Sequence, residues 1–213
     1  MTMSKAVYFN TYKLKKGSSA QDFLAAVNDL FTEIVKNKGC VSSALLVAGE
    51  TWADYTVFET MDDLNAFVAA AKAASVSGDN EAAQKFYSFL NFNSCKSHHF
   101  NVEKSYNRDN IDFSASDIIS YHSYNLKKDA SAQDFLLAME KLNEEFVIRQ
   151  KGWVTSKSFF DGKTWADIVV FETQNDLDNF VILCNTNELT KKGSLCMDFS
   201  ALVSHTFTVE RRF

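Results

Sequence analysis

The sequence contains an internal repeat, and this repeat restricts the possible folds more than any other feature. The segment Ser19–Leu24, read SAQDFL, recurs unchanged as Ser131–Leu136. Three further blocks recur in the same order: Leu14–Lys16 as Leu126–Lys128, Thr51–Asp54 as Thr164–Asp167, and Phe58–Thr60 as Phe171–Thr173. The chain is therefore a tandem duplication. We place its seam in the polar stretch 105–116, which gives modules at 1–106 and 117–213.

Each module shows the same alternation of strand and helix periodicity. In the first, residues 6–14 read as a strand, and a helix follows with Ser18 and Ser19 as capping candidates. Strands at 41–47 and 52–59 form a hairpin, a second helix starts at Thr60, a further helical segment covers 81–90, and a strand covers 96–103. The last strand of the second module is expected at 203–210. The order is the ferredoxin-like βαββαβ.

The third strand of each module carries apolar side chains on both faces. Trp52 and Phe58 point one way, while Tyr55 and Val57 point the other. Because both helices of such a module cover one face of its sheet, the other face needs a second cover. We therefore predict an α+β fold in which two ferredoxin-like modules pack sheet to sheet and enclose a space between them.

Two segments carry a resemblance to a known superfamily. They are the first strand and turn, residues 8–17, and the segment 52–60 that leads into the second helix. The chain resembles the dimeric α+β barrel superfamily over nearly its whole length, twice, and within it the antibiotic-biosynthesis monooxygenase type. The resemblance implies an oxidoreductase without a cofactor, in which a bound, deprotonated substrate reacts directly with oxygen.

Haem-degrading members of this superfamily use an Asn, a Trp and a His. Asn10 matches the Asn, but Phe67 stands at the Trp position, and no His occurs between residues 67 and 90. In the second module the corresponding residues are His122 and Phe180. This set of three residues is incomplete in both modules, so the resemblance does not extend to haem degradation.

The first strands supply the main candidate site residues. Asn10 and His122 are equivalent, and they share a strand face with Tyr12 and Tyr124. If this face lines the space between the sheets, it gives a small-ligand cavity in which His122 acts as the base and the other three groups position the substrate. The alternative is that these groups bond to one another and satisfy the core.

Further aligned pairs are weaker candidates for the same cavity. His98 and His205 align, as do Trp52 and Trp165. Histidines on strands often bond to a neighbouring backbone, and the tryptophans can be packing residues. The Asp that follows each Trp, two positions later, is expected to be solvated or bonded to amides at the hairpin turn.

Composition excludes several classes of function. The net charge is −5 with dispersed Lys and Arg, so nucleic acid is not an expected partner. No secretory signal or membrane-spanning run is found, and we expect a cytoplasmic protein that does not bind a membrane. The four cysteines form no CxxC pair, so no metal site is expected.

Two classes of function stay open from the sequence. The first is a cofactor-independent monooxygenase acting on a small aromatic or polyketide-like molecule. The second is a non-catalytic small-molecule binding protein on the same scaffold, with haem binding as a further alternative. The partners expected are a small-molecule ligand, the duplicated module as a pseudo-dimer within one chain, and a possible further copy of the chain.

Overall fold

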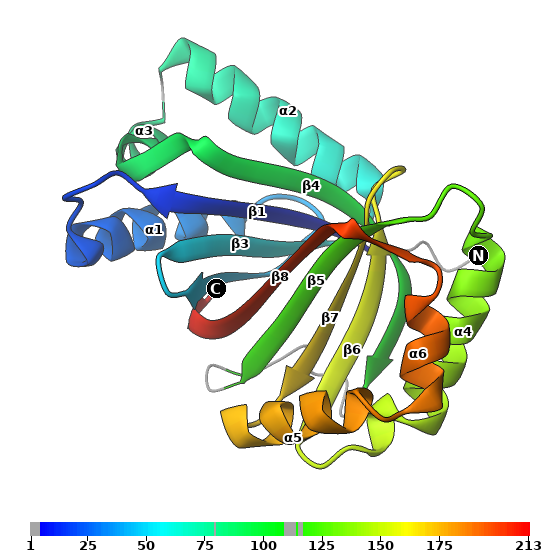
Figure 1. Cartoon of the computed structure of the whole chain (residues 1–213). Helices are drawn as coiled ribbons and strands as arrows, with labels where there is room; N and C mark the ends of the chain where they lie inside the picture. Colours follow the sequence, from blue (N-terminus) through cyan, green and yellow to red (C-terminus); the bar gives the residue numbers. More distant parts are fainter. Residues whose placement is uncertain (1–4, 79, 109–113, 115–116) are drawn as a thin grey trace. The chain divides into compact units, whose positions relative to one another are not determined.

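The computed structural model describes residues 5–78, 80–108, 114 and 117–213. It contains two compact units (Figure 1). Unit 1 is Met1–Asn101 with Glu210–Phe213, and unit 2 is Val102–Val209. The expected seam at 105–116 lies partly outside the described residues.

Unit 1 has the predicted order of strands and helices. Its elements are β1 (Ala6–Leu14), α1 (Ala20–Ile34), β2 (Cys40–Ala48), β3 (Thr51–Phe58), α2 (Met61–Ser77), α3 (Glu81–Phe89) and the first part of β4 (Leu90–Asn107). The strands pair antiparallel in the order β4-β1-β3-β2. Strand β4 begins six residues before the predicted strand, directly at the end of α3.

Unit 2 repeats this arrangement. Its elements are β5 (Ile118–Leu126), α4 (Ala132–Glu145), a short 3-10 helix η1 (Val147–Arg149), β6 (Trp153–Phe160), β7 (Trp165–Phe171), α5 (Gln174–Cys184), α6 (Glu188–Ser194) and β8 (Met197–Arg212). The strand order is β8-β5-β7-β6. The helix α6 was not predicted from the sequence.

The two long strands each begin in one unit and end in the other. The end of β8 joins unit 1, where the backbone of Phe213 exchanges two hydrogen bonds with that of Ser43 in β2. The end of β4 joins unit 2, where the Thr155 hydroxyl in β6 donates to the carbonyl of Tyr106. In the described residues, the hydrogen-bonded strand order β1-β3-β2-β8-β5-β7-β6-β4 closes on itself, as in an antiparallel barrel. The predicted α+β fold class is confirmed.

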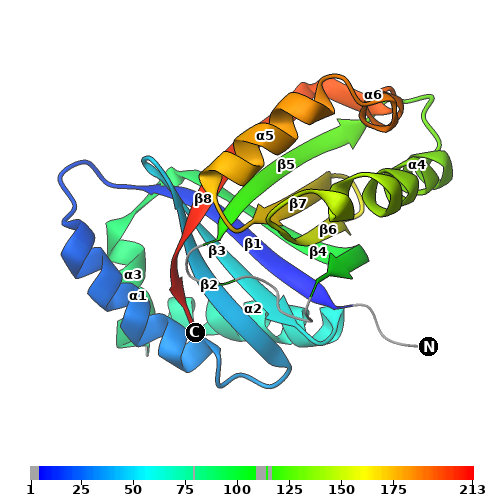
Figure 2. The ribbon, with the colours of Figure 1, turned by 90° about the horizontal axis from the view of Figure 1, so that it is seen from below.

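Local sequence explains where the helices begin. The hydroxyls of Ser19 and Ser131 accept the backbone N–H of Asp22 and Asp134, which caps α1 and α4. At the start of α2, the Thr60 hydroxyl accepts the backbone N–H of Asp63 and donates to the Asp63 carboxylate. Helices α1 and α3 then lie side by side against unit 1's sheet (Figure 2).

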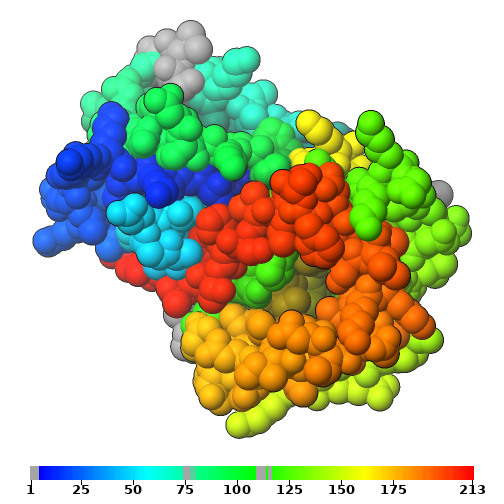
Figure 3. Space-filling view, in the orientation of Figure 1, coloured from blue at the N-terminus to red at the C-terminus, as the bar shows by residue number. Residues whose placement is uncertain are grey.

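Burial of β3 agrees with the sequence pattern. Phe58 on the helix face and Tyr55 and Val57 on the other face are all 2% exposed or less. In unit 2, the helix α5 lies at the surface (Figure 3), and the side chain of its residue Ile182 is 64% exposed. No described helix is both long enough and apolar enough to cross a membrane.

Candidate functional site

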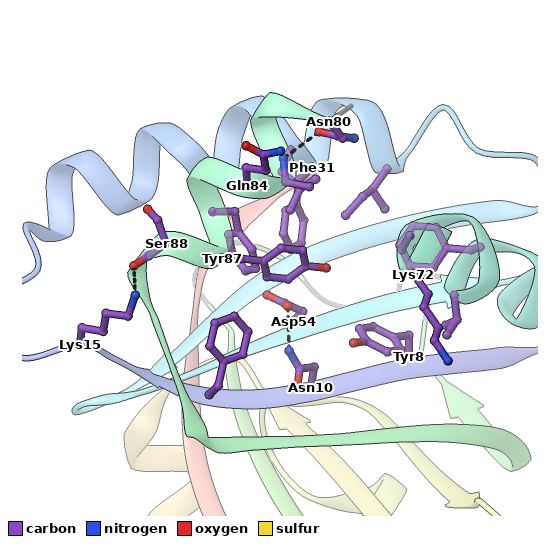
Figure 4. Close-up of a pocket in the computed structure, with 18 residues that line it drawn as sticks. Tyr8, Asn10, Lys15, Phe31, Asp54, Lys72, Asn80, Gln84, Tyr87 and Ser88 are labelled. Atoms are coloured by element: carbon purple, nitrogen blue, oxygen red, sulfur yellow. Dashed lines mark hydrogen bonds between the residues drawn. The ribbon is translucent and has the colours of Figure 1, made fainter. Parts of the chain in front are cut away.

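A pocket of about 700 Å³ lies between the sheet of unit 1 and its helices (Figure 4). Its floor is formed by Asn10 of β1 and Asp54 of β3, which are both buried. The walls and rim are formed by Tyr8, Lys15, Leu30, Phe31, Ile34, Phe67, Val68, Ala71, Lys72, Asn80, Ala83, Gln84, Phe86, Tyr87, Ser88 and Phe92. A mostly apolar wall with a few polar groups at the floor is typical of a small-molecule site.

Strand register brings the polar floor together. Asn10 lies directly opposite Ser97 of β4 on one side and Asp54 of β3 on the other. Side chains at directly opposite positions of antiparallel strands point to the same face, so all three face the helices. The Ser97 hydroxyl donates to Asn10 Oδ1 over 2.8 Å, and Asn10 Nδ2 donates to Asp54 Oδ2 over 3.4 Å. The bond from Ser97 orients the Asn10 amide with its N–H groups toward the carboxyl.

Tyr12 completes the surroundings of Asp54. Its hydroxyl donates to Asp54 Oδ1 over 2.7 Å. The ring of Tyr12 packs edge-on against Phe23 of α1 and Phe86 of α3, with centroids 6.2 and 5.8 Å away. Tyr12 is therefore held under the pocket by the helices that form its walls.

Asp54 has an altered acidity because of this location. Burial raises the pKa of Asp54 to about 7, although hydrogen bonds from Tyr12 and Asn10 act in the opposite direction. A carboxyl group with a pKa near neutrality can accept and return a proton at physiological pH. Asp54 is therefore the candidate base of this site.

Two further phenols face the pocket. Burial raises the pKa of Tyr8 to about 12, partly offset by a hydrogen bond with Ser97. Burial also raises the pKa of Tyr87. Both hydroxyls therefore stay protonated at neutral pH and can donate hydrogen bonds to an oxygen of a bound molecule.

The location of this pocket corrects one expectation from the sequence. We expected Asn10 and Tyr12 to line a space between two sheets, but both side chains face the helices of unit 1. The reason is that positions 6, 8, 10 and 12 of β1 lie on the face that α1, α2 and α3 cover. The alternation of residues along β1 does not by itself tell which of the two buried faces of the strand holds a cavity.

The equivalent residues of unit 2 have different partners. Ser204, His122 and Asp167 lie in the same register as Ser97, Asn10 and Asp54. Both ring nitrogens of His122 are hydrogen-bonded to serine hydroxyls, Nδ1 to Ser204 over 2.8 Å and Nε2 to Ser120 over 3.0 Å. Burial lowers the pKa of His122, which favours the neutral ring.

Tyr124 and Asp167 repeat the pair found in unit 1. The Tyr124 hydroxyl donates to Asp167 Oδ2. Burial raises the pKa of Asp167 to about 6, against the effect of the Tyr124 hydrogen bond. Unit 1 and unit 2 thus share a buried Tyr–Asp pair and differ at the residue beside it, Asn10 or His122.

The remaining candidates lie elsewhere in the two units. His98 stacks on Phe100 with centroids 4.9 Å apart, one position from Ser97 and so on the opposite strand face, and His205 is 5.2 Å from Phe207. Trp52 packs on Phe23 and Trp165 on Phe135, both at 5.0 Å, as packing partners of the helices. Among the described residues, no group of three or more His, Cys, Asp or Glu could hold a metal ion.

Sequence reasoning missed the role of Asp54. Asp54 and Asp167 were expected to be solvated or bonded to amides at the hairpin turn, but both are buried within strands, at 5% and 8% exposure. The available signal was an acidic residue, repeated in both modules, on the face of an apolar strand that also carries Trp52 and Phe58. A carboxylate on such a face is buried and needs hydrogen-bond donors.

Comparison with solved structures decides the fold. A proposed monooxygenase from Fusobacterium nucleatum superposes with a TM-score of 0.72 at 10% identity, over 100% of this chain and 95% of its own. A ferredoxin-fold protein from Listeria monocytogenes, related to antibiotic biosynthesis monooxygenases, gives 0.56 at 9% identity, over 98% and 96%. This chain has the dimeric α+β barrel fold.

Other matches agree with the dimeric α+β barrel fold. An anthrone oxidase-like protein superposes with a TM-score of 0.68 at 11% identity, over 99% of this chain and 93% of its own. No protein-family model and no curated protein matches the sequence. At these identities the similarity concerns the fold, which is shared with proteins described as monooxygenase-like.

Proposed function

We propose that this protein is a cofactor-independent monooxygenase that binds a small aromatic or polyketide-like molecule in the pocket of unit 1. The observation that carries the proposal is Asp54, a buried carboxyl group with a pKa of about 7 at the floor of an aromatic-walled pocket. The anthrone oxidase-like protein with the same fold supports an activated aromatic substrate.

The proposed reaction starts with a proton transfer. The Asp54 carboxylate removes a proton from an acidic CH2 or OH group of the substrate, while Asn10 and Tyr12 stabilise the ionised carboxylate beforehand. Tyr8 and Tyr87 donate hydrogen bonds to the substrate oxygen on which negative charge develops. The apolar walls exclude water and so strengthen both effects.

Oxygen then reacts with the substrate anion. For a CH2 group between two rings, the carbon loses two hydrogens and gains one oxygen atom to become a carbonyl, and the second oxygen atom leaves as water. The four electrons that reduce O2 come from this carbon, so the balance needs no external reductant. The pocket supplies orientation, a base and a dry environment.

Oxygen consumption tests this proposal. Purified protein without added metal or cofactor is incubated with a hydroxyanthrone, and uptake is measured with an oxygen electrode together with the mass of the product. We expect a product carrying one atom from labelled O2, and a fall in kcat of about 100-fold or more in Asp54→Asn. Oxygen uptake at the wild-type rate in Asp54→Asn would contradict the assigned base.

A non-catalytic binding protein is the second candidate. It is favoured by the fact that both Asp54 oxygens already accept hydrogen bonds, from Tyr12 and Asn10. Such a protein would bind the hydroxyanthrone without consuming oxygen above the rate measured without protein. The same assay therefore separates the two candidates.

A further inference from the structure

The charged side chains that line the pocket are separated by the sign of their charge. The acidic group, Asp54, lies at the buried floor, whereas the two cationic side chains, Lys15 and Lys72, are exposed residues at the rim (Figure 4). The chain as a whole carries a net charge of −5. Two lysines at the mouth of an apolar pocket are therefore a local exception to the overall charge.

Lys15 has a structural role that both modules share. Its Nζ donates to the carbonyl of Ser88 at the end of α3 over 2.6 Å. In unit 2 the equivalent Lys127 donates to the carbonyl of Leu195 at the end of α6 over 2.8 Å. The repetition indicates that this contact holds the strand to the helix end, where a cation compensates the helix dipole.

Lys72 is specific to unit 1. It lies on α2, one residue after Ala71 of the pocket wall, and its side chain descends toward Tyr8 (Figure 4). The equivalent position in unit 2, reached through the aligned residues Phe67 and Phe180, is Asn185 at the end of α5. The difference between the modules thus places a positive charge at the pocket that contains Asp54.

The mouth also presents aromatic surface. Phe92 of β4 lines the pocket although it is 61% exposed, and its ring lies 6.2 Å from that of Tyr87. A flat ring system that extends from the floor past Tyr87 would bury part of Phe92.

We infer that the ligand of this pocket is an aromatic anion whose carboxylate or similar acidic group pairs with Lys72 at the rim, while its reactive carbon faces Asp54. This inference rests on the proposed function for the orientation of the reactive carbon. The opposite orientation would place the ligand's acidic group against the Asp54 carboxylate, where like charges repel in a poorly solvated environment. The pocket therefore selects both the class of ligand and its direction of entry.

Calorimetric binding of two probes of the same shape tests the inference. The probes are 2-naphthoate and the neutral 2-naphthamide, titrated into wild-type protein, Lys72→Met and Lys72→Arg. We expect the wild type to prefer the naphthoate, and Lys72→Met to reduce this preference about three- to five-fold, the range for an ion pair at an exposed rim. Lys72→Arg keeps the charge and should keep the preference.

The control removes an equal charge elsewhere. Lys163 lies exposed in the hairpin between β6 and β7 of unit 2, so Lys163→Met should leave the naphthoate preference at its wild-type value. An unchanged preference in Lys72→Met, or an equal loss in Lys163→Met, would overturn the inference. Binding is measured without oxygen turnover, so such a result would not count against Asp54 as the base. The oxygen-uptake test decides that assignment separately.

Discussion

The Tyr12 hydroxyl donates a 2.7 Å hydrogen bond to Oδ1 of Asp54, beneath a pocket that Asp54 itself lines. The same pair recurs as Tyr124 and Asp167 in unit 2. The repeated pair shows that a buried carboxyl group is part of the duplicated framework. Only in unit 1 does an Asn beside it donate to the carboxyl group and face the described pocket.

The first prediction concerns stability. Because the folded-state pKa of Asp54 is raised from 3.8 to about 7, the unfolded chain ionises Asp54 first, and this group lowers the free energy of unfolding as pH rises through that window. Asp54→Asn removes the effect, so the variant should be more stable than the wild type at pH 8, by up to about 4 kcal/mol, and close to it at about pH 4. Denaturant titrations at both values measure the difference. A variant less stable than the wild type at pH 8 would contradict the burial argument.

The second prediction concerns the hydrogen bond to Asp54. Tyr12→Phe removes a donor that stabilises the carboxylate, so the pKa of Asp54 should rise further, by about one unit. The pH at which oxygen uptake reaches half its maximum should move upward by the same amount. Tyr124→Phe is the matched control and should leave the profile in place; an unshifted profile in Tyr12→Phe would show that Asp54 does not set it.

The third prediction concerns the volume of the pocket. Ala71 on α2 lines it, so Ala71→Trp should fill the space and weaken 2-naphthoate binding by about 10-fold or more, since an indole displaces the ligand. Ala73→Trp, at an exposed position of the same helix, should bind as the wild type does. Calorimetry gives the affinities, and thermal denaturation confirms that both variants fold. Undiminished binding by Ala71→Trp would place the ligand elsewhere.

The fourth prediction concerns His122, which the sequence alone suggested as the base. Both of its ring nitrogens are hydrogen-bonded to serines, so His122→Ala should cost about 1–2 kcal/mol of stability, one to two net hydrogen bonds. Oxygen uptake should stay within about two-fold of the wild type, because a base contributes far more than this. Loss of turnover in this variant would move the catalytic base to unit 2.

Much of the fold could be predicted from the sequence, because duplication and periodicity are local signals. The blocks around Ser19 and Thr60 gave the helix starts, and apolar side chains on both faces of β3 correctly indicated burial of both. The extra length of β4 was missed, since the alternation of Leu90 and Phe92 with Asn91 and Asn93 spans only four residues. Pairing with β1, which is a tertiary interaction, extends that strand.

The candidate site was only partly predictable. Asn10 was selected because it is equivalent to His122 and shares a strand face with Tyr12, and it does line a pocket. Asp54 lay within the predicted strand 52–59, but its carboxylate was expected to be solvated or bonded to amides at the hairpin turn. The pairing of Asn10 with Asp54 depends on strand register between β1 and β3, 44 residues apart, which no local pattern specifies.

Steady-state oxygen uptake across pH, in the wild type, Asp54→Asn and Asp167→Asn, tests the assignment of the catalytic base most directly. The pKa of about 7 for Asp54 predicts a rate that rises with pH through neutrality in the wild type and in Asp167→Asn, and that is lost in Asp54→Asn. A full rate in Asp54→Asn, or an equal loss in Asp167→Asn, would contradict a base located in unit 1.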